Sequence, residues 1–405
     1  MRILLAFVAL ATPALAQNGK KPGPQPQGHP GVDQKLVDEA IRKGVAYLKS
    51  VGNFSTSYKV RTVELALWTL IHAGEPGSEI LQKDLFDRMM QDPLERTYNV
   101  SLQAMILEKM DRVKHQVRIF HCAQFLVDNQ HDYGQWGYGT PTTLIDPPKG
   151  VPSKDRAVAT VGGKSGKSAI PLLKLPVKKN PAHKDTWRGD NSNSQYAALG
   201  LRACHDAGIL LPDGVIQAAM KWWRDCQGVE EKSGDKKSVE KKPGPQATGQ
   251  VSADPHGWSY SSEGKTGWAR GKGSMTAGAV GGLAIYHYIL GQPWRADQDI
   301  LEGVRWMGDN FTVTDNPIGE GPRFHYYWLY GLERAGILYG TGFFGTHDWY
   351  KEGALYLLGA QKPDGSWVAD DEKVVDTCFA ILFLRRATRA LVPVASIDST
   401  PAGKK

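Results

Sequence analysis

A repeated unit, made of a helical segment, a Gln and a Gly-x-Trp turn, constrains the fold of this chain more than any other feature. Two copies match closely: "KEGALYLLGAQKPDGSW", which ends at Trp367, and "AQFLVDNQHDYGQW", which ends at Trp136. In both copies an aromatic–aliphatic pair precedes the Gln. A third copy, "AAMKWWRDCQ", reaches its Gly257 and Trp258 only after a charged insertion. Such self-similarity indicates one supersecondary unit stacked several times.

Each copy is followed, in places after a long insertion, by a second amphipathic segment. Apolar residues recur at i, i+3, i+4 and i+7 in "VRTVELALWTLIHAG", "NSQYAALGLRACHDAG" and "VVDTCFAILFLRRA", as the buried face of a helix requires. With degenerate copies included, the sequence predicts six helical hairpins, at about 34–73, 80–110, 116–208, 213–291, 297–338 and 348–390. Six antiparallel pairs can close into a ring of inner helices wrapped by outer helices. We therefore predict one all-α domain, an (α/α)6 toroid over residues 34–390.

The Gly-x-Trp turn has a structural explanation. Gly tolerates the left-handed backbone that ends a helix, and the following Trp can cover the end of a neighbouring hairpin. The Gln one turn earlier can hydrogen-bond unpaired helix-end groups of the next repeat. We therefore interpret this motif as a staple between hairpins.

The segments outside the hairpins have their own compositional signals. Residues 1–16, "MRILLAFVALATPALA", have the form of a secretory signal with an A-x-A cleavage site. Residues 17–33 and 391–405 are polar and rich in Pro or Gly, which predicts a flexible leader and tail. Long insertions fall at about 139–189 and 228–272. The apolar run in residues 1–16 is too short to span a membrane, and no other long apolar run occurs. We therefore expect an exported protein, periplasmic or secreted, without a transmembrane segment.

Charge and cysteine content add little to this. The net charge of +7 lies largely in Lys-rich insertions, which are typical of solvated loops, so no nucleic-acid partner is predicted. The four cysteines have no CxxC spacing, and the sequence leaves open whether they pair or stay free: Cys122, Cys204, Cys226 and Cys378.

The repeat pattern resembles the QW motif, the signature of squalene and oxidosqualene cyclases. Related repeats occur in the β subunits of protein prenyltransferases. The resemblance covers most of residues 34–390 and is closest in the copies that end at Trp136 and Trp367. It implies an (α/α)6 toroid whose inner helices line a central cavity. It also implies two catalytic devices that can be sought in this sequence.

The first device is the DxDD motif with which class II cyclases protonate their substrate. The matching stretch is "KVVDTC", in which Asp376 and Thr377 fit the last Asp and the Thr. Lys373 replaces the first Asp, and Val375 replaces the middle Asp, the proton donor in those enzymes. A general acid cannot act without its proton, so we predict no class II cyclase activity. Asp376 remains the candidate catalytic residue, although its position also suits a helix N-cap.

The second device is the catalytic zinc site of protein prenyltransferases, built from Asp-x-Cys and a His. "VVDTCF" supplies Asp376 and Cys378, and His325 in "PRFHYYWLYG" is the best partner. These residue types could bind zinc. However, the family's His lies in the hairpin after Asp-x-Cys, whereas His325 lies in the hairpin before it. We predict no cofactor, with zinc at these three residues as the alternative.

A ligand site is expected where the N-termini of the inner helices gather, because their positive dipole ends point there. Candidate ligand-binding residues are Tyr326, Tyr327 and Trp328, together with Asn191 in an N-cap cluster that begins at Asp190. Large cavities are mostly apolar, so the aromatic residues favour an apolar partner. Packing against neighbouring helices is the other explanation for them.

Together these observations predict an exported repeat protein that binds an apolar, isoprenoid-like ligand or a protein and does not cyclise a substrate. One alternative is an isoprenoid-processing enzyme that uses Asp376, with or without zinc. A second is a carbohydrate-active (α/α)6 enzyme, which needs two paired carboxylates. The best-placed carboxylates for that role are Glu64, Asp190 and Asp376, and none forms an evident pair in the sequence.

Overall fold

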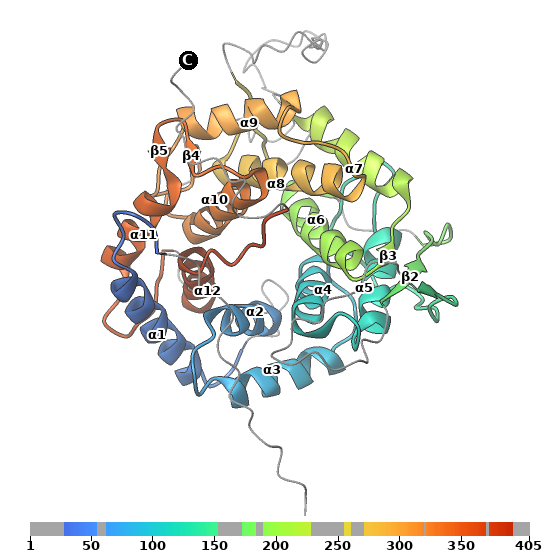
Figure 1. Ribbon diagram of the computed structural model, residues 1–405, viewed down its shortest axis with the longest axis horizontal. Coiled ribbons are helices and arrows are strands. Elements are labelled where there is room, and N and C mark those ends of the chain that lie inside the picture. The colour runs from blue at the N-terminus through green and yellow to red at the C-terminus, as the bar shows by residue number, and fades with distance from the viewer. Residues whose placement is uncertain are drawn as a thin grey trace, which may run out of the picture.

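The computed structural model describes residues 28–54, 62–152, 172–183, 189–227, 255–260, 271–319, 321–369 and 372–391. Within these residues, helices alternate between an outer and an inner ring (Figure 1). The outer helices are α1 (Gln34–Ser50), α3 (Glu79–Gln91), α5 (Gln116–Asp128), α7 (Asp213–Cys226), α9 (Gln298–Asp309) and α11 (Trp349–Ala360). The inner helices are α2 (Val63–Ala73), α4 (Thr97–Asp111), α6 (Asn191–Asp206), α8 (Gly273–Ile289), α10 (His325–Tyr339) and α12 (Lys373–Leu384). The predicted all-α toroid of six hairpins is confirmed.

The inner helices form a closed ring. Each one contacts the next in chain order, and α12 contacts α2. The inner helices are buried nearly all round; in α6, every residue from Asn191 to Cys204 is buried. The outer helices bury one face, as Val215, Ile216, Ala219 and Trp223 do in α7. This difference follows from position, because an inner helix packs against neighbours on several sides.

Tryptophans of the repeat fasten each turn to its own hairpin. Trp136, Trp258 and Trp367 are fully buried. Each indole Nε1 donates to a backbone carbonyl of the outer helix that precedes it in the same hairpin. The acceptor is the second residue of the pair that precedes the Gln: Leu126 at 2.7 Å, Trp223 at 2.6 Å and Leu357 at 2.8 Å. Each backbone N–H donates to a hydroxyl in the first turns of the following inner helix: Ser194 at 3.1 Å, Thr276 at 3.0 Å and Thr377 at 3.0 Å.

Glutamines of the repeat join one hairpin to the next. Their side-chain Nε2 atoms donate to backbone carbonyls of the following outer helix: Gln130 to Val215 at 2.8 Å, Gln227 to Asp299 at 2.9 Å and Gln361 to Ala40 at 2.8 Å. The last of these bonds connects the final hairpin to α1 and closes the outer ring. The acceptors are carbonyls inside the helices rather than the unpaired end groups expected from the sequence.

Two glycines of these turns are required by close backbone approach. A Cβ on Gly134, at φ 96°, would lie 2.0 Å from the carbonyl oxygen of Ala218. A Cβ on Gly365, at φ 87°, would lie 2.4 Å from the carbonyl oxygen of Lys43. Both glycines therefore supply the left-handed backbone and the space that lets successive hairpins touch.

Short strands lie on the outside of the toroid. β1 (Val151–Pro152) pairs antiparallel with β2 (Leu173–Pro176), which pairs parallel with β3 (Ile209–Leu210). β4 (Phe343–Phe344) pairs antiparallel with β5 (His347–Asp348). The four cysteines, whose state the sequence left open, are unpaired and buried.

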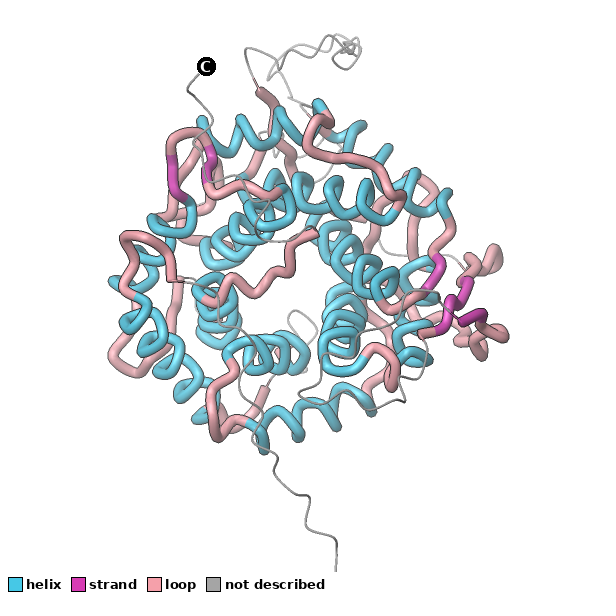
Figure 2. Tube along the Cα trace, viewed as in Figure 1, coloured by secondary structure: helices cyan, strands magenta, loops and turns pink. Residues whose placement is uncertain are grey.

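Several predicted segments lie largely outside the described residues: the signal peptide at 1–16, the leader at 17–33, the tail at 391–405 and much of both insertions. In the part of the chain that the structure describes, no helix has the length and apolar character needed to cross a membrane. The last predicted hairpin is too long, because α12 ends at Leu384 and residues 385–391 continue without regular structure across the inner ring (Figure 2).

Candidate functional site

Aromatic side chains from α2, α4, α6, α10 and α12 meet inside the inner ring. We call this cluster the aromatic centre; its members are Trp68, Tyr98, Tyr196, Tyr327, Tyr330 and Phe379. The ring centroids of Tyr98 and Tyr196 lie 4.2 Å apart, and those of Tyr196 and Tyr327 lie 6.4 Å apart and stack. Phe379 lies 5.7 Å from both Tyr327 and Tyr330. Residues far apart in the chain thus form one aromatic surface at the middle of the toroid.

Polar groups connect the members of the aromatic centre. The hydroxyls of Tyr98 and Tyr327 lie 3.3 Å apart, and the Gln195 side-chain amide also donates to the Tyr327 hydroxyl. The Trp68 indole donates to the Tyr330 hydroxyl at 3.2 Å. Tyr98 and Tyr327 are only partly buried, although both lie within the ring. Both tyrosines therefore keep some accessible surface.

A buried arginine lies beneath these tyrosines. Arg334 is 3% exposed, and its Nη2 donates to the Gln195 side-chain oxygen at 3.0 Å. Its guanidinium carbon lies 4.2 Å from the ring centroid of Tyr330 and 5.4 Å from that of Tyr196, a cation–π arrangement. Burial alone would lower the pKa of Arg334, but interactions with Tyr196 and Tyr330 outweigh it and raise the pKa. The aromatic centre therefore combines apolar ring faces with one fixed positive charge.

The predicted aromatic residues of α10 divide between two environments. Tyr327 belongs to the aromatic centre. Tyr326 lies next to His325, with ring centroids 5.1 Å apart, and the Trp328 indole donates to the Thr312 carbonyl at 3.0 Å. Consecutive helical residues point about 100° apart, so three neighbouring side chains cannot share one face. The spacing of Tyr327, Tyr330 and Arg334 on one helix face is the sequence signal that identifies the inward stripe.

The sequence-based search missed most of the aromatic centre. It did not select Trp68, Tyr98, Tyr196 and Phe379, nor Gln195 and Arg334. Each lies on an inner helix, but ring closure decides which of the buried faces meet in the middle.

The predicted N-cap cluster of α6 is confirmed at Asp190. Its carboxylate accepts from the Asn193 backbone N–H at 2.7 Å and from the Ser192 hydroxyl at 2.7 Å. Asn191, a candidate for ligand binding, is fully buried; its amide donates to the Ser259 carbonyl at 2.8 Å and accepts from the Trp222 indole at 2.7 Å. The structure thus gives Asn191 a role in fixing a loop to α7.

Asp376 is not the N-cap of its helix, contrary to the prediction. Glu372 occupies that position, and Asp376 is the fourth residue of α12. Asp376 is 4% exposed, and its carboxylate accepts from the Ala369 backbone N–H at 2.8 Å. The neighbouring Thr377 holds the Trp367 turn. The stretch that resembles the cyclase motif therefore organises the loop before α12.

The proposed zinc ligands are not gathered by the fold. Among the residues that the structure describes, no group of three or more His, Cys, Asp or Glu side chains is placed to hold a metal ion. Burial raises the pKa of the Cys378 thiol to about 12, whereas a zinc ligand must be a thiolate. The His325 Nε2 lies 2.9 Å from the Val313 carbonyl, to which it donates. Asp376, Cys378 and His325 thus do not fit a zinc site in this arrangement.

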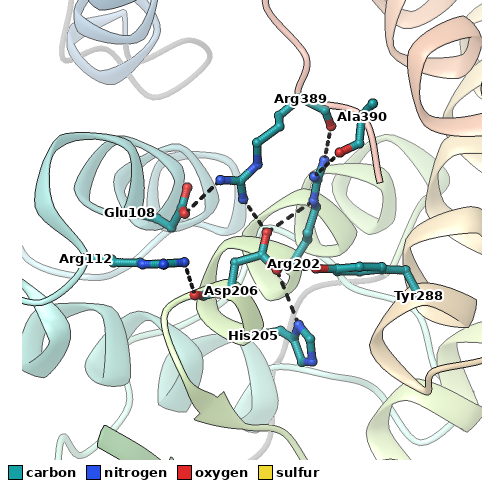
Figure 3. Close-up of polar contacts among 8 residues, drawn as sticks. All are labelled: Glu108, Arg112, Arg202, His205, Asp206, Tyr288, Arg389 and Ala390. Carbon is teal, nitrogen blue, oxygen red and sulfur yellow. Dashed lines mark hydrogen bonds and ion pairs between the residues drawn. The ribbon is translucent and has the colours of Figure 1, made fainter. Parts of the chain in front are cut away.

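The toroid has a mouth on the side where inner helices α4 and α6 end. Residues 385–391, which we call the C-terminal strap, cross this mouth, and Figure 3 shows the contacts of Arg389 and Ala390 there. The Arg389 guanidinium contacts the carboxylates of Glu108, at 3.2 Å, and Asp206. Arg202 donates to the carbonyls of Arg389 at 2.5 Å and Ala390 at 3.1 Å. Although burial would raise it, contacts with His205, Arg202 and Arg389 hold the pKa of Asp206 at about 2.

A fully buried carboxylate also holds the strap. Glu333 of α10 is 0% exposed and accepts from the Thr388 backbone N–H at 3.0 Å and from its hydroxyl at 2.6 Å. Burial raises the pKa of Glu333 to about 7 despite these two hydrogen bonds. No sequence signal indicates this site, because Glu333 lies in an otherwise ordinary helical stretch.

Comparison with known proteins does not assign this chain to a family. No protein-family model matches this chain, and no curated protein matches it. Among solved structures, the apo form of the type II terpene cyclase MstE from Scytonema is similar at 12% sequence identity and a TM-score of 0.29, with 87% of this chain and 99% of that chain covered. A likeness at this level says nothing about activity.

Proposed function

We propose that this chain is an exported, non-cyclising binding module of the squalene-cyclase and prenyltransferase repeat type, and that the aromatic centre holds an apolar, isoprenoid-like ligand. The observation that carries this proposal is the convergence of aromatic side chains from α2, α4, α6, α10 and α12 inside one ring. Aromatic faces offer a large apolar contact area, and ligand sites are mostly apolar with few convergent polar groups. Tyr98, Tyr327 and Gln195 would supply those polar groups.

The residues at the cyclase motif support binding rather than cyclisation. Val375 and Lys373 cannot donate the strong acid proton that the reaction needs. Asp376 accepts a structural hydrogen bond from Ala369. An isoprenoid-processing enzyme that depends on Asp376, with or without zinc, is therefore a weaker proposal than a binding module.

The carboxylates considered for carbohydrate chemistry also have structural partners. Glu64 accepts from the Asn99 amide at 2.6 Å, and Asp190 caps α6. Glycosidases require two carboxyl groups that face each other across the bond to be cleaved. These contacts favour a structural role for both side chains.

A protein partner is a second candidate, and the C-terminal strap is the feature that favours it.

Native mass spectrometry of the mature chain, residues 17–405, recovered in exported form tests the proposal. The wild-type protein should retain a noncovalent mass that matches an isoprenoid lipid. Tyr327→Ala should lose that mass, whereas Tyr133→Ala should retain it, because Tyr133 is 77% exposed. A bare polypeptide mass for the wild-type protein would contradict the proposal.

A further inference from the structure

Polar contacts hold the end of the C-terminal strap, together with packing of Leu391 against the core. Residues 388–391 are partly or fully exposed, and they form neither helix nor strand. Their backbone groups are nevertheless bound one after another. Glu333 accepts the N–H of Thr388, and Arg202 donates to the carbonyls of Arg389 and Ala390. Main-chain hydrogen bonding of this kind is how extended peptides are recognised.

Two side chains of the strap, those of Thr388 and Arg389, also make specific polar contacts. The Thr388 hydroxyl donates to the buried Glu333 carboxylate at 2.6 Å. The Arg389 guanidinium lies between Glu108 and Asp206. Charge-assisted hydrogen bonds from Arg to carboxylates are among the stronger polar contacts in proteins. These contacts fit a hydroxyl residue followed directly by a basic residue.

The receiving surface is organised without help from the strap (Figure 3). Arg202 and Asp206 pair along α6, with Nε and Oδ2 3.4 Å apart. The Tyr288 hydroxyl donates to Asp206 at 2.9 Å, and Arg112 donates to the Asp206 carbonyl at 3.0 Å. These contacts join α4, α6 and α8. We expect them to persist when the strap leaves, so the site is preformed.

The backbone is strained where the strap leaves α12. Arg386 has φ 46°, in the left-handed region that residues other than Gly rarely adopt. Strained backbone of this kind persists only where surrounding contacts enforce it, and it is frequent at switch regions. Release of the strap would relieve this strain.

We propose that the mouth formed by Glu108, Arg202, Asp206 and Glu333 is a peptide-binding site that the strap occupies in cis. Its ligand in trans is an extended segment of another protein in which Thr or Ser directly precedes Arg. The Arg389 guanidinium lies between the carboxylates of Glu108 and Asp206, which favours a basic residue at this position of the segment. Glu108, Arg202 and Asp206 lie near the C-terminal ends of α4 and α6, and Glu333 lies within α10. The site does not depend on the proposed isoprenoid site.

Fluorescence anisotropy with the full-length chain tests this inference. The probe is a labelled peptide with the strap sequence "RATRAL", residues 386–391. The double variant Thr388→Val/Arg389→Ala, in which the strap is weakened, should bind the probe at least about tenfold more tightly than the wild type, because a tethered segment competes at a high effective concentration. Adding Glu108→Gln to that variant should weaken binding again. The matched control peptide "RAVAAL" should bind neither protein.

Equal binding of the probe by wild type and double variant would overturn the proposal, and so would equal binding of the control peptide. Hydrogen exchange of the wild-type chain gives a second test that needs no variant. Excess "RATRAL" peptide should speed exchange in residues 386–391 while α6 stays protected. Unchanged exchange at millimolar peptide would also overturn the proposal.

Discussion

The Tyr98 hydroxyl of α4 lies 3.3 Å from the Tyr327 hydroxyl of α10, and these two helices stand on opposite sides of the inner ring (Figure 1). Around the ring they are separated by α6 and α8 on one side and by α12 and α2 on the other. The contact therefore spans the interior, where both side chains keep accessible surface. A ligand in the aromatic centre would lie against this pair or separate it.

Tyr327→Phe should destabilise the fold. The substitution removes the hydroxyl that contacts Tyr98 and accepts from Gln195, and Gln195 is 3% exposed. A buried amide without a partner lowers the free energy of unfolding by about 1–3 kcal/mol. Urea denaturation measures this difference. The exposed Tyr133→Phe control should change stability by less than about 0.5 kcal/mol. Equal stability of Tyr327→Phe and wild type would contradict the prediction.

Gln361→Leu should loosen the closure of the outer ring. The Gln361 amide donates to the carbonyl of Ala40 at 2.8 Å and to that of Gly365 at 2.9 Å. Its loss should lower stability by about 1 kcal/mol and speed proteolysis within α1. Gln34→Leu is the control, because Gln34 is partly exposed and its amide donates to Asp38 of its own helix at 3.0 Å. Identical proteolysis of the two variants would argue against this account of ring closure.

Glu333 should make the fold less stable as the pH rises towards 8. Burial raises the pKa of Glu333 from 4.5 to about 7. The stabilisation from this group is therefore fully present below about pH 4.5 and is lost as the pH rises through about 7. A shift of this size corresponds to a difference on the order of 3 kcal/mol.

The variant Glu333→Gln, which does not titrate, isolates this effect. Urea unfolding at pH 5 and pH 8 should show a larger loss of stability for the wild type than for Glu333→Gln. Parallel behaviour of the two proteins over this interval would show that Glu333 is not the source of the pH dependence.

Chelation should leave the protein intact. Because Asp376, Cys378 and His325 are not gathered into one group, dialysis against EDTA should not change the melting temperature. Elemental analysis should find no stoichiometric zinc. If zinc is present at one per chain and is lost in Cys378→Ala, the zinc alternative would be correct.

The fold could be predicted from the sequence because its signals are local. Periodicity within 10 to 20 residues marks each helix, and the recurring Gln and Gly-x-Trp mark each turn. The hairpin at 213–291, for example, contains α7 and α8 despite its long insertion. The N-cap at Asp190 was predictable for the same reason, since its partner Asn193 is three residues away.

The candidate site could not be predicted to the same extent, because it depends on closure of the ring. Tyr98 and Tyr327 are 229 residues apart in sequence, and no local pattern pairs them. Asp376 suits a helix N-cap by residue type, but its carboxylate accepts from the Ala369 N–H in the loop before α12. Apolar periodicity extends the last predicted hairpin to residue 390, because a local pattern does not reveal that Glu333 and Arg202 hold residues 388–390.

Direct titration with geranylgeraniol, followed by tryptophan fluorescence, tests the central claim most directly. The wild-type chain should bind this apolar isoprenoid alcohol saturably and one-to-one. Phe379→Ala should weaken binding by at least about tenfold, since burying a Phe side chain contributes about 1.5–3 kcal/mol and about 1.4 kcal/mol is a factor of ten. Tyr133→Ala should bind like the wild type. Absence of saturable binding, or equal binding by Phe379→Ala, would contradict an isoprenoid site in the aromatic centre.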